Sequence, residues 1–198
     1  MPEASIPPGW NYNPSSWGQR LPLVGVALVG FGIASYLTLY QIHVVSHVWD
    51  PFFGAGTEKV LTSRISRMLP IPDAALGAFG YLMDAVSGAV GPRRRWQKMP
   101  WIVLLFGLAV GPLGVVSIGL VMSQPLIVGH WCTLCLCSAI ISVVMIGPAL
   151  DEVLASLQYL QRVKHNGRSI WRAFWGTAEP QAETVPERNA GAAGIYKG

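Results

Sequence analysis

Long uncharged runs alternate with short charged segments along this chain. From Trp101 to Leu150 there is no Asp, Glu, Lys or Arg, and only 12% of the 198 residues are charged. A soluble domain usually carries about 25% charged residues. A run of about 20 apolar residues is long enough to cross ~30 Å of hydrocarbon as a helix. The pattern therefore predicts an all-α, polytopic membrane protein.

Four apolar runs predict four membrane spans, at about 21–48, 71–90, 101–122 and 130–150. Residues 1–20 are polar and form a predicted N-terminal cytoplasmic or interfacial segment. Small residues such as Gly107 and Gly111, four apart in the third run, let helix backbones approach closely in lipid. We therefore expect residues 21–150 to form a tight four-helix bundle.

The helical pattern continues past the fourth run. Apolar residues recur there at helical spacing, at Leu150, Val153, Leu154, Leu157, Leu160 and Val163. Aromatic and basic residues follow together, which is typical of an interfacial anchor: Arg168, Ile170, Trp171, Arg172, Phe174 and Trp175. Residues 151–175 are therefore predicted to be an amphipathic or interfacial helix. Residues 176–198 are poor in bulky side chains and are predicted to be a disordered tail.

Basic residues in the short loops predict the orientation. Four lie in the 91–100 loop and four follow the last span, whereas the 123–130 turn has none. Loops rich in Lys and Arg stay in the cytoplasm. The 49–70 loop is also basic, so the even number of spans and the uncharged turn decide the assignment. Both termini are predicted to be cytoplasmic, and the net charge of +4 reflects these loops rather than a nucleic-acid surface.

Cys132 and Cys135 begin the fourth run, one helical turn apart. Residues at i and i+3 share a helix face, so the two thiols can form a disulfide and exchange two electrons. A helix N-terminus favours the thiolate, which predicts Cys132 as the exposed nucleophile or leaving group. Cys135 lies one turn deeper, where an apolar oxidant such as a lipid quinone could reach it. Both would lie on the outer side, where disulfides persist.

Cys137 and the histidines leave other hypotheses open. Cys137 lies about 200° from Cys135 around a helix, so we interpret it as a small buried hydrophobe rather than a third redox partner. His130 and the three cysteines offer nitrogen and sulfur ligands, but their directions diverge and no metal is predicted. His43 and His47, four apart, either ligate a metal or haem edge or lie in the membrane interface.

Two carboxylates and three aromatic residues of the 49–70 loop are further candidate functional residues. Asp73 opens the second span, where it can cap the helix amides, contact a ligand, or do both. Asp84 lies deeper, and a carboxylate inside a span is a functional candidate, although its role stays open. Trp49, Phe52 and Phe53 either form a lid over a pocket or anchor the loop at the interface.

The order of several motifs carries a family resemblance. These are Ser35-Tyr36-Leu37, Val60-Leu61-Thr62-Ser63-Arg64, Pro72 with Gly77-Ala78-Phe79-Gly80-Tyr81, and Trp131-Cys132-Thr133-Leu134-Cys135. Over roughly residues 20–150 the chain resembles the vitamin K epoxide reductase family. Members of that family are four-helix membrane bundles that use this cysteine pair to reduce a quinone or its epoxide. Bacterial members pass disulfides to a thioredoxin-like periplasmic partner.

The resemblance implies a protein of the bacterial inner membrane with its cysteine pair on the periplasmic side. Cys132 would exchange with incoming thiols, and Cys135 would attack or electronically contact a lipid quinone. Asp73 and Ser63 match family positions near the quinone oxygen, and Phe53 is predicted to bind the quinone as well. The quinone is the expected substrate, with membrane lipid and a thiol protein as the other partners.

The chain departs from the family in the loop after the first span. The family usually carries two further cysteines there, but the 49–70 loop has none, and Thr57 occupies the second position. Ala139 stands where vertebrate relatives place a tyrosine. Two hypotheses follow. Either an external thiol reaches Cys132 directly, or the chain is a non-catalytic quinone- or lipid-binding subunit of a larger complex.

Overall fold

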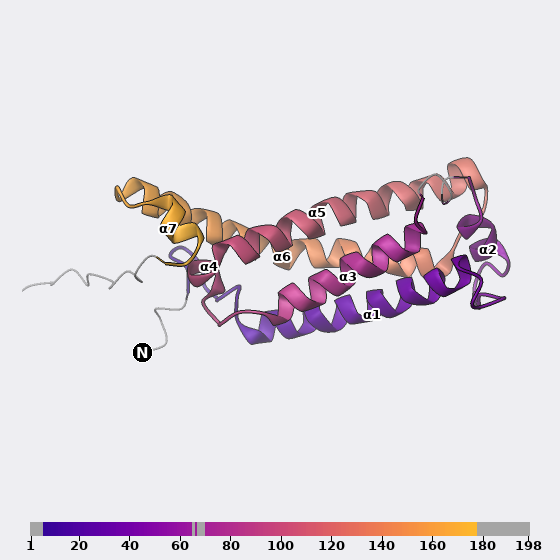
Figure 1. Cartoon of the computed structure of the whole chain (residues 1–198), viewed down its shortest axis with the longest axis horizontal. Coiled ribbons are helices and arrows are strands. Elements are labelled where there is room, and N and C mark those ends of the chain that lie inside the picture. The colour runs from indigo at the N-terminus through magenta and orange to yellow at the C-terminus, as the bar shows by residue number, and fades with distance from the viewer. Residues whose placement is uncertain (1–5, 65, 67–69, 178–198) are drawn as a thin grey trace, which may run out of the picture.

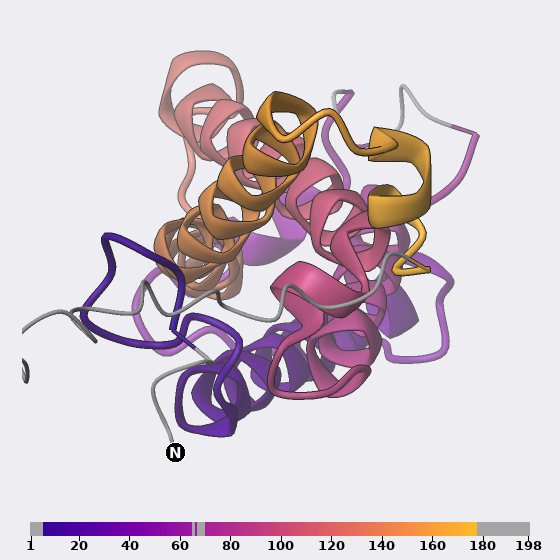
Figure 2. The ribbon, with the colours of Figure 1, turned by 90° about the vertical axis from the view of Figure 1, so that its left-hand side faces the viewer.

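Four long helices lie side by side in a computed structural model that describes residues 6–64, 66 and 70–177 (Figures 1 and 2). They are α1 (Trp17–Gln41), α3 (Asp73–Ala89), α5 (Pro100–Ser123) and α6 (Thr133–His165). The predicted all-α class is confirmed. Three of these helices are long and apolar enough to cross a membrane: α1, α6, and α5 with the π-helical turn η2 (Gln124–Val128). α3 has 17 residues, and its crossing stays a prediction.

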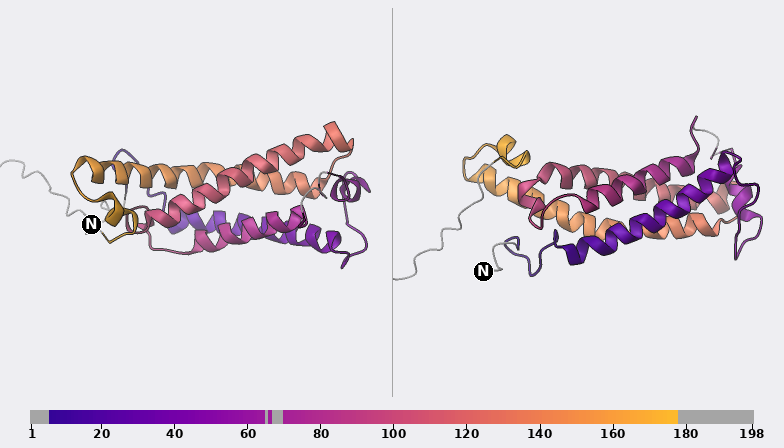
Figure 3. Two further views of the ribbon diagram at one scale, coloured as in Figure 1. Left: turned by 45° about the horizontal axis from the view of Figure 1, so that its top comes forward. Right: turned by 60° about the horizontal axis from the view of Figure 1, so that its bottom comes forward.

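The short helices lie at the two ends of the bundle (Figures 1 and 3). α2 (Gly56–Leu61) covers one end, and we call residues 49–61 the cap and this end the cap end. α4 (Arg95–Lys98) and α7 (Ile170–Phe174) lie at the opposite end, with the start of α1. Of the predicted disordered tail, residues 178–198 lie outside the described residues.

α1 ends at Gln41, seven residues before the predicted end of the first span at 48. The cause is a turn in which His43 adopts a left-handed φ of 62°. The His43 amide donates to Tyr40 O at 3.0 Å and the Val44 amide to Leu39 O at 2.9 Å. This is the Schellman pattern that closes helix C-termini, usually with glycine at the left-handed position.

The other helices differ less from the predicted bounds. α3 spans Asp73–Ala89, whereas the sequence predicts a span over residues 71–90. α5 begins at Pro100, and the chain stays helical through η2 to Val128, beyond the predicted end at 122. Gly129 then breaks the helix with a left-handed φ of 71°. α6 starts at Thr133 rather than 130, because Cys132 is extended and serves as its N-cap.

Glycines allow the helices to pack closely. Gly30 of α1 lies against the ring of Tyr81 of α3, where a Cβ would fall 2.7 Å from the ring. Gly107 and Gly114 of α5 lie against side chains of α6, whereas Gly111 has no such neighbour within 4 Å. The close approach of α5 therefore uses glycines seven residues apart, two helical turns, instead of the predicted pair at 107 and 111.

α6 continues to His165, and mainly small and polar residues form its buried face beyond 150. Glu152, Ala155, Ser156, Tyr159 and Val163 are buried, whereas Leu150, Leu154 and Leu157 are exposed. The small and polar face accommodates the N-terminal segment and α4, whose Trp96 ring meets the Tyr159 ring edge-on at 6.0 Å. The leucines are consequently directed outward.

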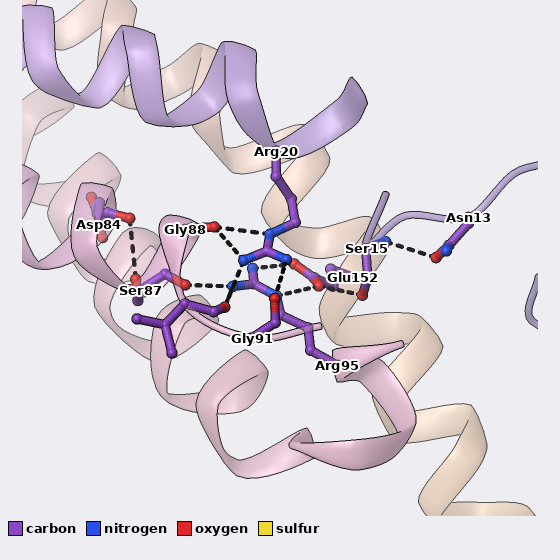
Figure 4. A network of polar contacts seen from close by, with 10 residues as sticks. Asn13, Ser15, Arg20, Asp84, Ser87, Gly88, Gly91, Arg95 and Glu152 are labelled. Atoms are coloured by element: carbon purple, nitrogen blue, oxygen red, sulfur yellow. Dashed lines mark hydrogen bonds and ion pairs between the residues drawn. The ribbon is translucent and has the colours of Figure 1, made fainter. Parts of the chain in front are cut away.

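A buried ionic cluster joins the chain at the α4 end (Figure 4). The Arg95 guanidinium pairs with both carboxylate oxygens of Glu152, and both side chains are at most 2% exposed. Arg20 donates to the carbonyls of Gly88 and Gly91, where α3 leaves its last carbonyl groups without helical partners. Arg95 belongs to the basic 91–100 loop that predicts the orientation, yet its side chain is buried inside the bundle.

We predict that Glu152→Ala destabilises the bundle by about 3–5 kcal/mol, because it leaves the buried Arg95 guanidinium without its carboxylate. Thermal unfolding of the purified protein in detergent would measure the loss. The matched control is Asp151→Ala at the neighbouring position, which removes only a hydrogen bond from Tyr12 at 2.6 Å. Equal melting temperatures for the two variants would contradict this account of the cluster.

Candidate active site

Cys132 and Cys135 are joined in a disulfide at the start of α6, with Cα atoms 5.3 Å apart. Cys132 is the N-cap of the helix, and its Sγ accepts the Cys135 amide at 3.1 Å. The two sulfurs therefore lie on one ridge at the cap end. A dithiol–disulfide pair in this position can store and release two electrons.

Cys132 is 0% exposed, so the prediction that its sulfur is exposed is wrong for this conformation. The cap covers it. Gly56 at the start of α2 lies against the carbonyl oxygen of Trp131, where a side chain would collide with the backbone. The Cys132 amide donates to Gln124 Oε1 at 3.1 Å on the other side. A thiol from outside can reach Cys132 only if the cap moves.

The Asp50 carboxylate links the cap to the head of α6. It accepts the Phe52 and Phe53 amides at 3.0 and 2.9 Å, the Thr57 hydroxyl, and the Thr133 hydroxyl at 2.5 Å. Burial raises the pKa of Asp50, but these hydrogen bonds outweigh it and hold the pKa well below its usual range. Sequence reasoning did not single out Asp50, and Thr57 drew attention only because a cysteine is missing there.

A cavity of about 300 Å³ lies on the other side of the disulfide. Cys135, Asp73 and Ser63 all line it, so the structure brings together three of the five predicted site residues. Most of the remaining wall is apolar and includes Leu37, Leu61, Leu113, Val116, Leu120 and Val121. A small apolar cavity with a few polar groups is typical of a ligand pocket.

Asp73 is held at the cap end of this cavity by a small hydrogen-bond network. Its Oδ1 accepts the Gln41 side-chain amide at 2.5 Å and the Ser66 hydroxyl at 2.8 Å. The same oxygen accepts the Ala74 amide at 2.9 Å, at the start of α3. Both predicted environments of Asp73, the helix start and the pocket, are therefore present. Gln41 and Ser66 were not found from the sequence.

Hydroxyl side chains of α3, α5 and α6 form a second polar region at the cavity. The Tyr81 hydroxyl lies 2.9 Å from Ser138 Oγ and 2.7 Å from Ser142 Oγ, and Ser117 donates to Ser142 at 3.2 Å. Tyr81, Ser117 and Ser138 line the cavity. We call these four residues the hydroxyl cluster. The sequence offered only the helical spacing of the serines as a signal.

The remaining aromatic residues and Cys137 lie outside the cavity. Phe53 is 43% exposed and packs on Trp131 with ring centroids 6.4 Å apart, so it does not line the pocket as predicted. Trp49 and Phe52 are exposed on the cap. Cys137 is a free, exposed cysteine on the outer surface of the bundle, so it does point away from Cys135, but the prediction that it is buried is wrong.

The histidines are kept apart by the early end of α1. His43 and His47 follow that helix instead of sharing one of its faces. His47 Nδ1 lies 2.6 Å from Glu58 Oε1, and His130 Nε2 lies 3.2 Å from Lys59 Nζ. Within the part of the chain that the structure describes, no three His, Cys, Asp or Glu side chains gather in a way that could hold a metal.

Long apolar helices with a disulfide at the head of one of them, beside an apolar cavity, define an integral membrane protein with a buried thiol–disulfide centre. The chain belongs to the vitamin K epoxide reductase family, whose model matches residues 21–150. Members of this family are generally membrane oxidoreductases that act on thiols and quinones. Comparison with curated proteins and with solved structures finds no match.

We predict that the cap loosens in acid. Closure of the cap lowers the pKa of Asp50, so the ionised carboxylate stabilises the closed cap at pH values above its ordinary pKa of about 3.9. This stabilisation is lost as the pH falls from there through the lower pKa of the closed cap. Reduction of the Cys132–Cys135 disulfide by a charged phosphine should therefore accelerate below about pH 4.

Asp50→Asn should be reduced about tenfold faster than the unmodified protein at neutral pH, because the amide cannot accept all of these hydrogen bonds. In this variant the rate of disulfide reduction should also no longer rise below about pH 4. Asp151→Asn, at the opposite end of the bundle, is the matched control and corrects for the reagent's own pH dependence. Identical profiles for both variants would show that Asp50 does not hold the cap.

Proposed function

We propose that this protein exchanges two electrons between the Cys132–Cys135 pair and a lipid quinone, with an external thiol protein as the electron donor. The observation that carries the proposal is the position of the disulfide, with Cys135 in the wall of a cavity that also contains Asp73 and Ser63. Membership of the vitamin K epoxide reductase family supports the same chemistry.

The two cysteines take different roles. A thiolate of the donor attacks the Cys132 sulfur, the S–S bond breaks, and Cys135 leaves as a thiolate. A second donor thiol then attacks the mixed disulfide and releases Cys132, so that the donor is oxidised and the pair is reduced. Cys135 next attacks or electronically contacts the quinone, and Cys132 re-forms the disulfide. The quinone gains two electrons and two protons and leaves as hydroquinone.

The polar residues of the cavity would orient the quinone. A hydroquinone hydroxyl can donate to the Asp73 carboxylate, whose Oδ1 is already fixed by Gln41 and Ser66. The Ser63 hydroxyl lies in the same wall and can donate to a quinone oxygen. Phe53 packs on Trp131, so it would contact the quinone only after the cap rearranges.

The thiol donor would approach from the cap end. Cys132 is buried beneath the cap, and a donor protein that displaces residues 49–61 would reach it. The basic residues of the 91–100 loop and of the segment after the last span support an orientation with this end in the periplasm of a bacterial cell and with both termini and α4 in the cytoplasm. A thioredoxin-like protein is the class of partner that the family resemblance implies.

A non-catalytic role as a quinone- or lipid-binding subunit is the second candidate. The complete burial of Cys132 and the absence of cysteine from the 49–70 loop favour it. Native purification with mass spectrometry separates the two functions. A single chain that reduces quinone with thiols supports the enzyme, whereas stable co-purification with other proteins and no activity supports the subunit.

We predict that Cys135→Ala lowers dithiol-dependent quinone reduction to the uncatalysed rate, since the remaining thiol cannot form the internal disulfide. Absorbance of the quinone in a detergent assay measures this directly. Cys137→Ala is the matched control, because that cysteine lies on the outer surface, and it should keep full activity. Undiminished turnover by Cys135→Ala would end the proposal.

We predict that Asp73→Asn raises the KM for quinone about tenfold, the loss expected for one hydrogen bond between a charged and a neutral group. Reduction of the disulfide by dithiol should stay unchanged in this variant, because Asp73 lies in the cavity and not at the cap. Titration of the initial rate against quinone concentration separates the two steps. An unchanged KM would remove Asp73 from the quinone site.

A further inference from the structure

Asp84 is a buried carboxyl group without a hydrogen-bond partner. It lies in α3 at 2% exposure, and neither of its side-chain oxygens is bonded to another described group. Burying a lone charge costs far more than burying a neutral acid, so we expect Asp84 to hold a proton at rest. Carboxyl groups are rare inside membrane helices and usually mark ion or proton pathways.

The carboxyl group of Asp84 points away from the ionic cluster at the α4 end (Figure 4). Arg20 and Arg95 donate instead to the carbonyls that end α3 and to Glu152. Helix side chains lean toward the helix N-terminus, which for α3 is the end beside the cavity. Asp84 is therefore not a member of the ion cluster, although it lies next to it in the chain.

The hydroxyl cluster forms part of the cavity wall, and its Tyr81 lies one helical turn from Asp84 along α3. Tyr81 is one turn nearer the cap on the same buried face of α3, and residues three apart are neighbours on a helix. Its hydroxyl contacts Ser138 and Ser142, and Ser138 opens into the cavity that holds Cys135. A proton on Asp84 would have to reach this cluster by rotation of the Asp84 side chain or through a bridging water.

Few other titratable groups of the described residues lie on the helices packed around Asp84. Arg20 of α1 and Arg95 of α4 are bonded elsewhere, and Glu152 of α6 pairs with Arg95. α5 carries no Asp, Glu, Lys or Arg between Pro100 and Ser123. On α3 itself the nearest titratable group toward the cavity is Tyr81. Asp84 is thus the carboxyl group between the α4 end and the hydroxyl cluster.

We propose that Asp84 relays protons from the α4 end of the bundle to the quinone, through the hydroxyl cluster. This inference rests on the proposed quinone reduction. When the dithiol of Cys132 and Cys135 is oxidised, its two electrons pass to the quinone and its two protons leave at the cap end. The quinone takes two protons through Asp84, one after the other. Each turnover thereby moves protons from one side of the membrane to the other.

The test uses the full chain in liposomes with menaquinone-4 in the bilayer and a pH-sensitive dye inside. A charged phosphine added outside reduces only molecules whose cap faces outward, and valinomycin with potassium removes the membrane potential. The interior should become alkaline by about two protons per quinone reduced, the stoichiometry of hydroquinone formation. Vesicles with Cys135→Ala give the background from direct reaction of phosphine with quinone.

Asp84→Asn should slow quinone reduction by about 100-fold or more, the usual effect of removing a proton-transfer group, and abolish the internal pH change. Ser87→Ala is the matched control, because that hydroxyl donates only to the backbone carbonyl of Asp84. Asp84→Glu keeps the carboxyl group and should retain internal proton uptake at a lower rate. Ser142→Ala should weaken uptake by interrupting the hydroxyl cluster.

The outcomes are distinguishable. If the unmodified protein fails to reduce quinone above background, the proposed function is wrong. If it reduces quinone while the interior keeps a constant pH, the protons come from the cap end and the relay is wrong. The relay is also wrong if Asp84→Asn keeps both the rate of quinone reduction and the internal pH change of the unmodified protein. Should Asp84→Asn fail to fold, Ser142→Ala and Asp84→Glu decide by the same two readouts.

Discussion

The bidentate pairing of Arg95 with Glu152 is the interaction on which the α4 end of the structure depends. Arg95 is almost fully buried, and its guanidinium donates both to the Glu152 carboxylate and to the Val90 carbonyl, so its charge and its donors are compensated. The pair fixes the short α4 helix against α6 and places Arg95 over the end of α3. Ser15 adds the N-terminal segment by donating to the same carboxylate. The N-terminal segment, the turn between α3 and α4, and α6 therefore meet at one pair of charges.

The cap end is organised by a different kind of contact. There the Asp50 carboxylate gathers amide and hydroxyl donors from its own loop, from α2 and from the head of α6. Leu61 at the end of the cap also packs with Val48 and Leu37 in a small apolar cluster. Opening of the cap would uncover the disulfide, while the ionic cluster would hold the opposite end of the bundle together. Such an arrangement suits a site that must admit a partner without losing its cavity.

The sequence predicts the helical class and the redox pair because both depend on local patterns. Uncharged runs define the helices, and the spacing of Cys132 and Cys135 places their sulfurs on one ridge. The end of α1 could not be predicted, because a left-handed conformation at His43 follows from no local preference. Nor does any pattern separate Arg95, which is buried, from its neighbours in the basic loop. Asp50 was missed for a related reason, since its partners come together only in the folded protein.

The outward leucines of α6 have a consequence for how deeply the protein sits in the bilayer. Leu150, Leu154 and Leu157 cover about 10 Å of helix beyond the last residue of the uncharged run, at ~1.5 Å per residue. Lipid acyl chains would contact these leucines, while the charges of Arg95 and Glu152 compensate each other on the buried side of α6. The membrane boundary at this end would then lie near the level of Leu157, two turns further along α6 than the charge pattern alone suggests.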